Sequence, residues 1–154
     1  MTDPPNPGPT SRLSQDTGLS VLTSNRQDLP VDEPALAALA EMTLRAEGAL
    51  SGELSLSFVA EEEMQELHQR YLGEPGPTDV LSFPMAEDGL LGDIVICPVE
   101  ARRSNADVPS ELRLLVVHGV LHLLGYDHEE EDERRVMWAK QDVYLVGPRR
   151  TSGP

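Results

Sequence analysis

Residues 118–128 read His-Gly-Val-Leu-His-Leu-Leu-Gly-Tyr-Asp-His and contain three of the four histidines in the chain. His118 and His122 are four residues apart, so on a helix they lie one turn apart on the same face. Gly125 can adopt the left-handed conformation that ends a helix, and the chain can then turn back and bring His128 towards the other two. Three neutral imidazoles suit a zinc ion, and on a tetrahedral ion they leave one position for water, as catalytic sites do.

The residues around these histidines are almost all apolar, which predicts a buried helix introduced by Pro109 and Ser110. One histidine on an apolar helix is usually a core residue with a satisfied hydrogen bond, and two at this spacing can arise by chance. A third histidine, with a glycine where the helix must stop, favours metal ligation, because unpaired polar rings are costly in an apolar environment. We therefore predict one Zn²⁺ per chain, held by His118, His122 and His128.

The spacing also matches the zinc-protease pattern His-Glu-x-x-His-x-x-Gly-x-x-His at every metal ligand and at the glycine. The glutamate of that pattern is the general base, and Gly119 takes its place here. A peptidase would need a base from elsewhere, so a metal hydrolase of this class remains only an alternative. The other alternative, a non-enzymatic protein with a structural metal, needs a fourth ligand. Cys97 and His68 are the soft candidates, although both can equally pack as buried residues.

The composition limits the cellular setting. The chain has 154 residues, a net charge of −15 and a single cysteine. We expect one domain at residues 18–147, a disordered proline-rich tail at 1–17 and a polar tail at 148–154. No apolar run reaches the length of a membrane span, no signal peptide is visible, and one cysteine fits a reducing cytosol, so we expect a cytoplasmic protein. The acidic charge argues against a membrane surface, DNA or a broad nucleic-acid-binding face.

Hydrophobic periodicity predicts alternating strands and helices along the chain. The expected strands are residues 18–24, 53–58, 78–83 and 91–97. The expected helices are residues 32–47, a second that begins at Glu61, one or two turns at 100–106, the helix after Pro109 and a closing helix at 131–146. The last two strands are joined by a short segment rich in turn residues, with a turn at 87–89, which favours an antiparallel pair.

Three blocks of this sequence resemble one known family. Residues 118–128 look like the signature of the YbeY family of bacterial endoribonucleases, and Pro77–Pro84 and Leu91–Ile96 resemble that family's two other characteristic blocks in the same order. The resemblance covers roughly residues 20–146. It implies an α+β fold, with a mixed sheet of about four strands covered by about five helices and the metal site on a buried helix and the turn after it.

The resemblance also implies an activity. It points to a zinc-dependent, single-strand-specific endoribonuclease that matures ribosomal RNA, notably the 3′ end of the small-subunit RNA, and takes part in ribosome quality control. The implied partners are single-stranded or ribosomal RNA and the ribosome or its proteins. With such partners, the non-enzymatic alternative becomes a ribosome-associated factor with a structural metal. Because the charge of −15 disfavours phosphate contacts, we expect the isolated chain to bind RNA weakly and to need the ribosome or a partner protein for tight binding.

The family often has Tyr-Arg before the loop that leads to the Thr-Asp-Val block, whereas this chain has Tyr71-Leu72, and its nearest arginine is Arg70. Arg70 and Leu72 are two positions apart, so on a helix they lie about 200° apart around the axis. Arg70 is therefore the candidate for the catalytic arginine, which would hold a phosphate in a fork geometry, only if the helix unwinds before Gly73. The alternative is a solvated surface residue.

Two carboxylates near the histidines are candidates for the chemistry. Asp127 and Asp93 can act as general base or orient the histidine rings. Asp127 can equally fix the chain reversal, and Asp93 can be a turn or strand-end residue. The sequence also leaves open whether water or the neighbouring 2′-OH of RNA is the nucleophile.

Overall fold

The computed structural model describes residues 18–73, 76, 78–85 and 89–146. The four strands are β1 (Leu19–Arg26), β2 (Gly52–Val59), β3 (Val80–Pro84) and β4 (Leu90–Ile96). They form one sheet in the order β1-β2-β4-β3. β1 and β2 run parallel, as do β2 and β4, whereas β3 runs antiparallel to β4. The sheet is therefore mixed, and the predicted antiparallel pair of the last two strands is confirmed.

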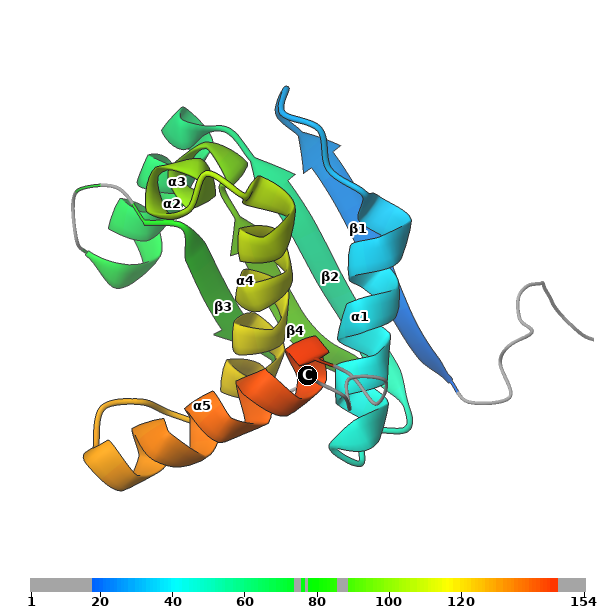
Figure 1. The fold of residues 1–154 in the computed structure, drawn as a ribbon. Coiled ribbons are helices and arrows are strands. Elements are labelled where there is room, and N and C mark those ends of the chain that lie inside the picture. Colours follow the sequence, from blue (N-terminus) through cyan, green and yellow to red (C-terminus); the bar gives the residue numbers. More distant parts are fainter. Residues whose placement is uncertain (1–17, 74–75, 77, 86–88, 147–154) are drawn as a thin grey trace, which may run out of the picture.

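The five helices in the described part of the chain confirm the predicted α+β class. They are α1 (Glu33–Ala46), α2 (Glu61–Leu72), α3 (Pro98–Ser104), α4 (Val108–Leu123) and α5 (Glu131–Val146). Figure 1 shows α1 and α4 next to each other over one face of the sheet, with α5 crossing near the C-terminal end of α4. None of the helices in the described residues is both long and apolar enough to cross a bilayer. The predicted tails at 1–17 and 148–154, and the turn at 87–89 apart from Gly89, lie outside the described residues.

Aspartates that precede a proline start two of the helices. The Asp32 carboxylate accepts a hydrogen bond from the Ala35 N–H at 3.1 Å, and Asp107 accepts one from the Ser110 N–H at 3.4 Å. Proline is tolerated just after such a cap because the first N–H groups of a helix have no intrahelical partner. For the same reason α3 begins at Pro98, two residues before its predicted start at Glu100. Pro98 therefore both ends β4 and opens the next helix.

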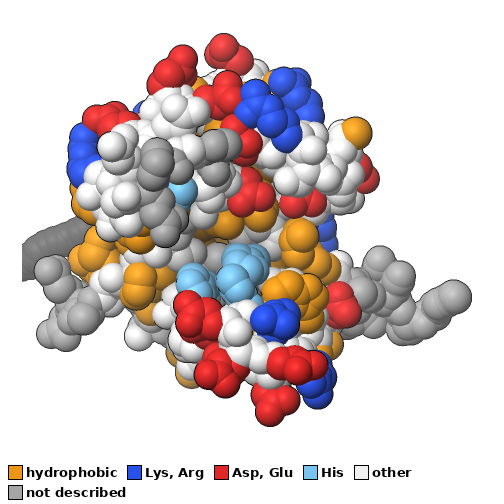
Figure 2. Space-filling view, turned by 90° about the vertical axis from the view of Figure 1, so that its left-hand side faces the viewer, with side chains coloured by type: hydrophobic (Ala, Val, Ile, Leu, Met, Phe, Trp, Pro, Cys, Tyr) orange, Lys and Arg blue, Asp and Glu red, His pale blue; other side chains and the backbone are white. Residues whose placement is uncertain are grey.

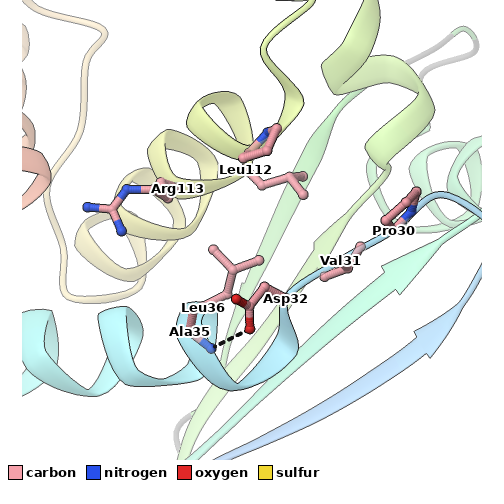
Figure 3. Close-up of a pocket in the computed structure, with 8 residues that line it drawn as sticks. Pro30, Val31, Asp32, Ala35, Leu36, Leu112 and Arg113 are labelled. Atoms are coloured by element: carbon pink, nitrogen blue, oxygen red, sulfur yellow. Dashed lines mark hydrogen bonds between the residues drawn. The ribbon is translucent and has the colours of Figure 1, made fainter.

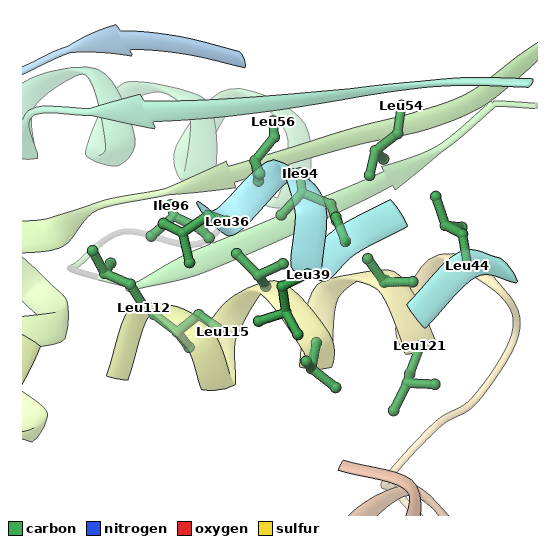
Figure 4. Close-up of a cluster of buried hydrophobic side chains, with 14 of the residues drawn as sticks. Leu36, Leu39, Leu44, Leu54, Leu56, Ile94, Ile96, Leu112, Leu115 and Leu121 are labelled. Atoms are coloured by element: carbon green, nitrogen blue, oxygen red, sulfur yellow. The ribbon is translucent and has the colours of Figure 1, made fainter. Parts of the chain in front are cut away.

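Alternation along the strands divides the core into two layers. The side chains of Leu54 and Leu56 are completely buried against α1 and α4, together with Ile94 and Ile96 of β4 (Figure 4). Phe58 is completely buried in the same cluster. The opposite face carries a smaller cluster next to α2, which consists of Val59, Met64, Leu81, Val95 and Cys97. The helix that carries the histidines is therefore packed on the first face.

Two glycines let the C-terminal half of α4 lie directly on the sheet. A Cβ atom added to Gly119 would lie 2.9 Å from Ile94 Cγ2, and one added to Gly92 would lie 2.9 Å from Leu123 Cδ2 and 2.6 Å from the Phe83 carbonyl oxygen. Both distances to carbon are shorter than van der Waals contact allows, so a side chain at either position would push helix and sheet apart. This close approach places the histidine end of α4 beside β3.

Candidate metal centre

The three histidines of residues 118–128 converge as their spacing predicts. His118 and His122 lie in the last two turns of α4, and His128 lies in the loop that follows. Gly125 adopts φ +105°, and the Tyr126 N–H donates to the Leu121 carbonyl at 3.1 Å, which closes the end of the helix and turns the chain back. The ring centres are 5.4 Å apart for His118 and His128, 5.9 Å for His122 and His128, and 6.1 Å for the two helical histidines.

Hydrogen bonds set the tautomers of the two helical histidines. His118 Nδ1 is 2.8 Å from Gln141 Oε1, and His122 Nδ1 is 2.9 Å from the Tyr126 carbonyl oxygen. Because both oxygens can only accept, each Nδ1 carries the proton and donates it, which leaves the Nε2 lone pair free for a metal. Burial lowers the pKa of His118, and the nearby His128 and His122 rings lower it further, which outweighs the opposing effect of Gln141. The neutral ring that a ligand requires is therefore favoured.

The donor chemistry fits zinc, but the rings lie slightly too far apart. With Zn–N distances of about 2.0–2.1 Å, three imidazoles on a tetrahedral ion have their centres roughly 5 Å apart. The observed separations reach 6.1 Å. No group of three His, Cys, Asp or Glu side chains in the described residues already has the spacing to hold an ion. Binding an ion would therefore draw the three rings together by up to about one ångström, within the range of small side-chain rotations.

The histidines lie in a cleft of about 370 Å³ between the end of α2, β3 and α4. It is lined by Leu72, residues 78–83 and the three histidines. Figure 2 shows the histidine side chains in a hollow of the surface, with hydrophobic and acidic side chains around them. Asp79 is the acidic residue among those that line the cleft, and its charge acts on His118. No role was predicted for Asp79 from the sequence, although it lies within Pro77–Pro84, one of the three blocks that carry the resemblance.

The structure does not bring the predicted catalytic residues into this cleft. Arg70 pairs with Glu66 at 2.5 Å on the exposed surface of α2, and Leu72, not Arg70, lines the cleft. The catalytic role of Arg70 therefore stays a prediction, and Arg70 occupies the position of a surface residue. Asp127 accepts a hydrogen bond from the His128 N–H at 2.7 Å, which fits a role in the chain reversal. Asp93 alternates with Ile94 and so faces the other side of the sheet.

The two candidates for a fourth protein ligand also lie elsewhere. Cys97 is fully buried in the cluster next to α2, and burial raises the pKa of its thiol. His68 is buried on α2, with Nδ1 3.1 Å from the Gly76 carbonyl oxygen. Neither residue lines the histidine cleft. Among the described residues, the three histidines are therefore the only soft donors that line the cleft.

A second, larger pocket of about 450 Å³ lies between the starts of α1 and α4 (Figure 3). Its charged lining residues are Asp32 and Arg113, and both are engaged in holding the fold. Asp32 caps α1 through the Ala35 N–H, and Arg113 donates to the Leu145 carbonyl at 3.1 Å. The remaining lining is mostly apolar. The histidine cleft is therefore the candidate site, although it is smaller.

A buried carboxylate supports the frame of the histidines. The side chain of Glu47, at the end of α1, is only 7% exposed. It accepts hydrogen bonds from Tyr126 Oη at 2.7 Å, from Lys140 Nζ at 3.0 Å and from Tyr144 Oη. Burial alone would raise the pKa of Glu47, but these donors and the lysine charge outweigh it and hold the pKa below its ordinary value. This cluster connects α1 to the loop whose carbonyl holds His122, and to α5.

Comparison with known proteins identifies the family. Residues 22–147 match the family described as Endoribonuclease YbeY. The chain belongs to the YbeY family. Two members, each named Endoribonuclease YbeY, show how close the relation is. The chain is 45% identical to the one from Thermobifida fusca over 149 residues, which cover 86% of this chain and 96% of the relative. It is 42% identical to the one from Streptomyces coelicolor over 154 residues, which cover 88% and 93%.

A solved structure supports the same relation. The solution structure of TM1509 from Thermotoga maritima aligns with a TM-score of 0.61 at 33% identity, covering 82% of this chain and 87% of that protein. The YbeY resemblance drawn from three sequence blocks is thus confirmed, and so is the α+β fold that it implied.

Proposed function

We propose that this chain is an endoribonuclease that cleaves single-stranded RNA with a zinc ion held by His118, His122 and His128. Its role in the cell is the maturation of ribosomal RNA, notably the 3′ end of the small-subunit RNA, and ribosome quality control in the cytoplasm. One observation carries the metal part of the proposal. Three imidazoles converge in a surface cleft, and two of them have Nδ1 held by an acceptor so that Nε2 is free. Membership of a family named for endoribonuclease activity supports the reaction.

Residues of the cleft and its surroundings would each have a role in RNA cleavage. When bound, zinc supplies a Lewis acid that polarises a phosphoryl oxygen and lowers the pKa of water. Gln141 and the Tyr126 carbonyl hold two imidazole rings in the correct tautomer. Asp79, in the same cleft, is the carboxylate best placed to accept a proton from water or from the 2′-OH of the RNA.

The peptidase alternative is disfavoured by the position of Gly119. This residue is buried, and a side chain there would run into Ile94 of the sheet. A glutamate at this position would therefore point into the core and could not act on water in the cleft. The structural-metal alternative is weakened because Cys97 and His68 lie outside the cleft.

The charge of the surface supports the expectation that the isolated chain binds RNA weakly. Several arginines are already paired with glutamates, which reduces the positive charge available to phosphates. These pairs are Arg26 with Glu63, Arg45 with Glu41, Arg70 with Glu66, and Arg103 with Glu61 and Glu100. The ribosome or a ribosomal protein would then supply the remaining contacts that tight binding needs.

The test measures zinc content and RNA cleavage on the same preparations of wild type, His122→Ala and His68→Gln. His68 serves as the control because it is the fourth histidine and lies outside the cleft. We expect about one zinc per wild-type chain and cleavage of single-stranded RNA, both lost in His122→Ala and kept in His68→Gln. If His122→Ala loses zinc but cleavage persists, the activity comes from a contaminant and the metal is structural.

A further inference from the structure

Trp138 is a large aromatic side chain left exposed beside the histidines. It is the only tryptophan of the chain, lies in the middle of α5, and is 45% exposed. Its indole contacts the His128 ring at a centroid distance of 5.9 Å, with the two planes perpendicular. Its neighbour Met137 is fully buried, and Gln141, one turn later, holds His118. The side of α5 that carries Met137 and Gln141 is therefore packed against the protein, and the indole of Trp138 lies next to the histidine cleft.

The basic side chains of α5 are all committed to other partners. Arg134 donates to the His128 and Glu129 carbonyls, Arg135 pairs with Glu131 and Asp132, and Lys140 pairs with Glu47. The first turn of α5 is acidic, with Glu131, Asp132 and Glu133 all exposed. The first turn of α5 therefore disfavours phosphates, and the three basic side chains of the helix already have partners within the protein. Any affinity for RNA on this side has to come from contacts other than charge.

An exposed indole supplies such a contact, because unpaired bases stack on aromatic side chains, whereas the bases of a duplex are already stacked and enclosed. We propose that Trp138 is the base-binding platform of the cleft, where its indole stacks on an unpaired nucleobase next to the scissile phosphate. The inference rests on the proposed ribonuclease function and names how the same site selects single strands. The indole contacts a predicted metal ligand, so a nucleotide stacked on it has its own phosphate within reach of the histidines.

Trp138 does not belong to the other exposed apolar residues of α5. Val136 is 50% and Val143 63% exposed, and they are seven residues apart on one stripe. Trp138 is two positions from Val136, about 200° around the helix axis. A partner helix that docks on the valine stripe would thus leave the indole on another side. Val143→Ala is accordingly a matched control, since it shortens an exposed apolar side chain of the same helix away from the cleft.

The first experiment uses Trp138 as its own reporter. Tryptophan fluorescence of the zinc-loaded protein is titrated with adenosine 5′-monophosphate and, separately, with ribose 5-phosphate. We expect the nucleotide to change the emission in a saturable way and the base-free sugar phosphate to leave it unchanged. Equal responses to the two probes would overturn the proposal, because they would show that phosphate binding alone is being detected.

The second experiment measures kcat and KM for cleavage of single-stranded RNA by wild type, Trp138→Ala, Trp138→Phe and Val143→Ala. Loss of one stacked base raises KM of the alanine variant about 10–100-fold, while zinc content and circular dichroism stay as in wild type. Phenylalanine, which retains an aromatic face, restores most of the loss, and Val143→Ala behaves as wild type. Unchanged KM in Trp138→Ala overturns the platform. The same variants are also assayed with ribosomes as substrate, and a defect seen there but not on naked RNA likewise overturns it, because Trp138 would then contact a protein. Absence of cleavage by wild type itself would instead refute the proposed function.

Discussion

Replacing Glu47 with alanine should destabilise the protein more than replacing the carboxylate of any other ion pair in the described residues. The change removes a nearly buried carboxylate that accepts hydrogen bonds from Tyr126, Lys140 and Tyr144. A hydrogen bond to a charged group contributes about 1.5–3 kcal/mol. Lys140 is 40% exposed and regains water, so the loss comes mainly from the two tyrosines. We expect the free energy of unfolding to fall by about 3–5 kcal/mol, close to the contribution of two hydrogen bonds to a charged group.

Urea unfolding followed by circular dichroism measures this loss. With an m-value of about 2 kcal/mol/M, the midpoint should fall by roughly 1.5–2.5 M. Glu41→Ala is the matched control, because Glu41 lies on the same helix, pairs with Arg45 and is 39% exposed. Its loss should stay within about 0.5 kcal/mol. If Glu47→Ala lowers the free energy of unfolding no more than Glu41→Ala does, the hydrogen bonds to Glu47 do not stabilise the loop that carries the histidines.

The pH dependence gives the same prediction an independent check. The pKa of Glu47 is below its ordinary value of 4.5 in the folded protein. A carboxylate with a lowered pKa contributes stability above its unfolded pKa and loses it as the pH falls through the folded value. The difference between wild type and Glu47→Ala should therefore be complete at neutral pH and shrink below about pH 4.5. A constant difference down to the acid transition would contradict the assignment.

Three further predictions concern single residues. Burial, and then the hydrogen bond to Glu47, raise the pKa of Tyr144 from 10 to about 12, so its contribution to stability is complete below pH 10 and lost as the pH rises towards 12. Tyr144→Phe should lack this alkaline loss in urea titrations, and an identical profile would refute it. Gln141→Leu should weaken zinc affinity about 10–100-fold in chelator competition, whereas unchanged affinity would show that Gln141 does not orient His118. Gly119→Glu should lower the free energy of unfolding by more than about 3 kcal/mol, because a buried charge would be forced against Ile94. The variant should not cleave casein. A variant as stable as wild type would show that α4 can move away from the sheet.

Local features of the sequence were enough to place most elements. The alternation of Leu54, Leu56 and Phe58 predicted β2, and Pro109 with Ser110 predicted the start of α4. The cap at Asp107 was seen only in the structure. The β3–β4 pair was also predictable, because an antiparallel connection needs only a short turn. The order of the strands was not predictable, because the parallel pairing of β2 with β4 joins segments that α2 and β3 separate in the chain, and no local pattern specifies such a pairing.

The convergence of the three histidines could be predicted from eleven residues, because it depends only on local geometry. One helical turn aligns His118 with His122, and the turn at Gly125 brings back His128. Everything that surrounds the triad depends on contacts between distant segments. Glu47 meets Tyr126 and Tyr144 across 79 and 97 residues, and Gln141 meets His118 across 23. Residues at such separations are brought together only when helices pack on the sheet, since no spacing rule links them beforehand. The sequence by itself therefore determined that the three histidines converge. The tertiary structure decided which side chains orient their rings, which residues line the cleft and why a side chain at position 119 would meet Ile94.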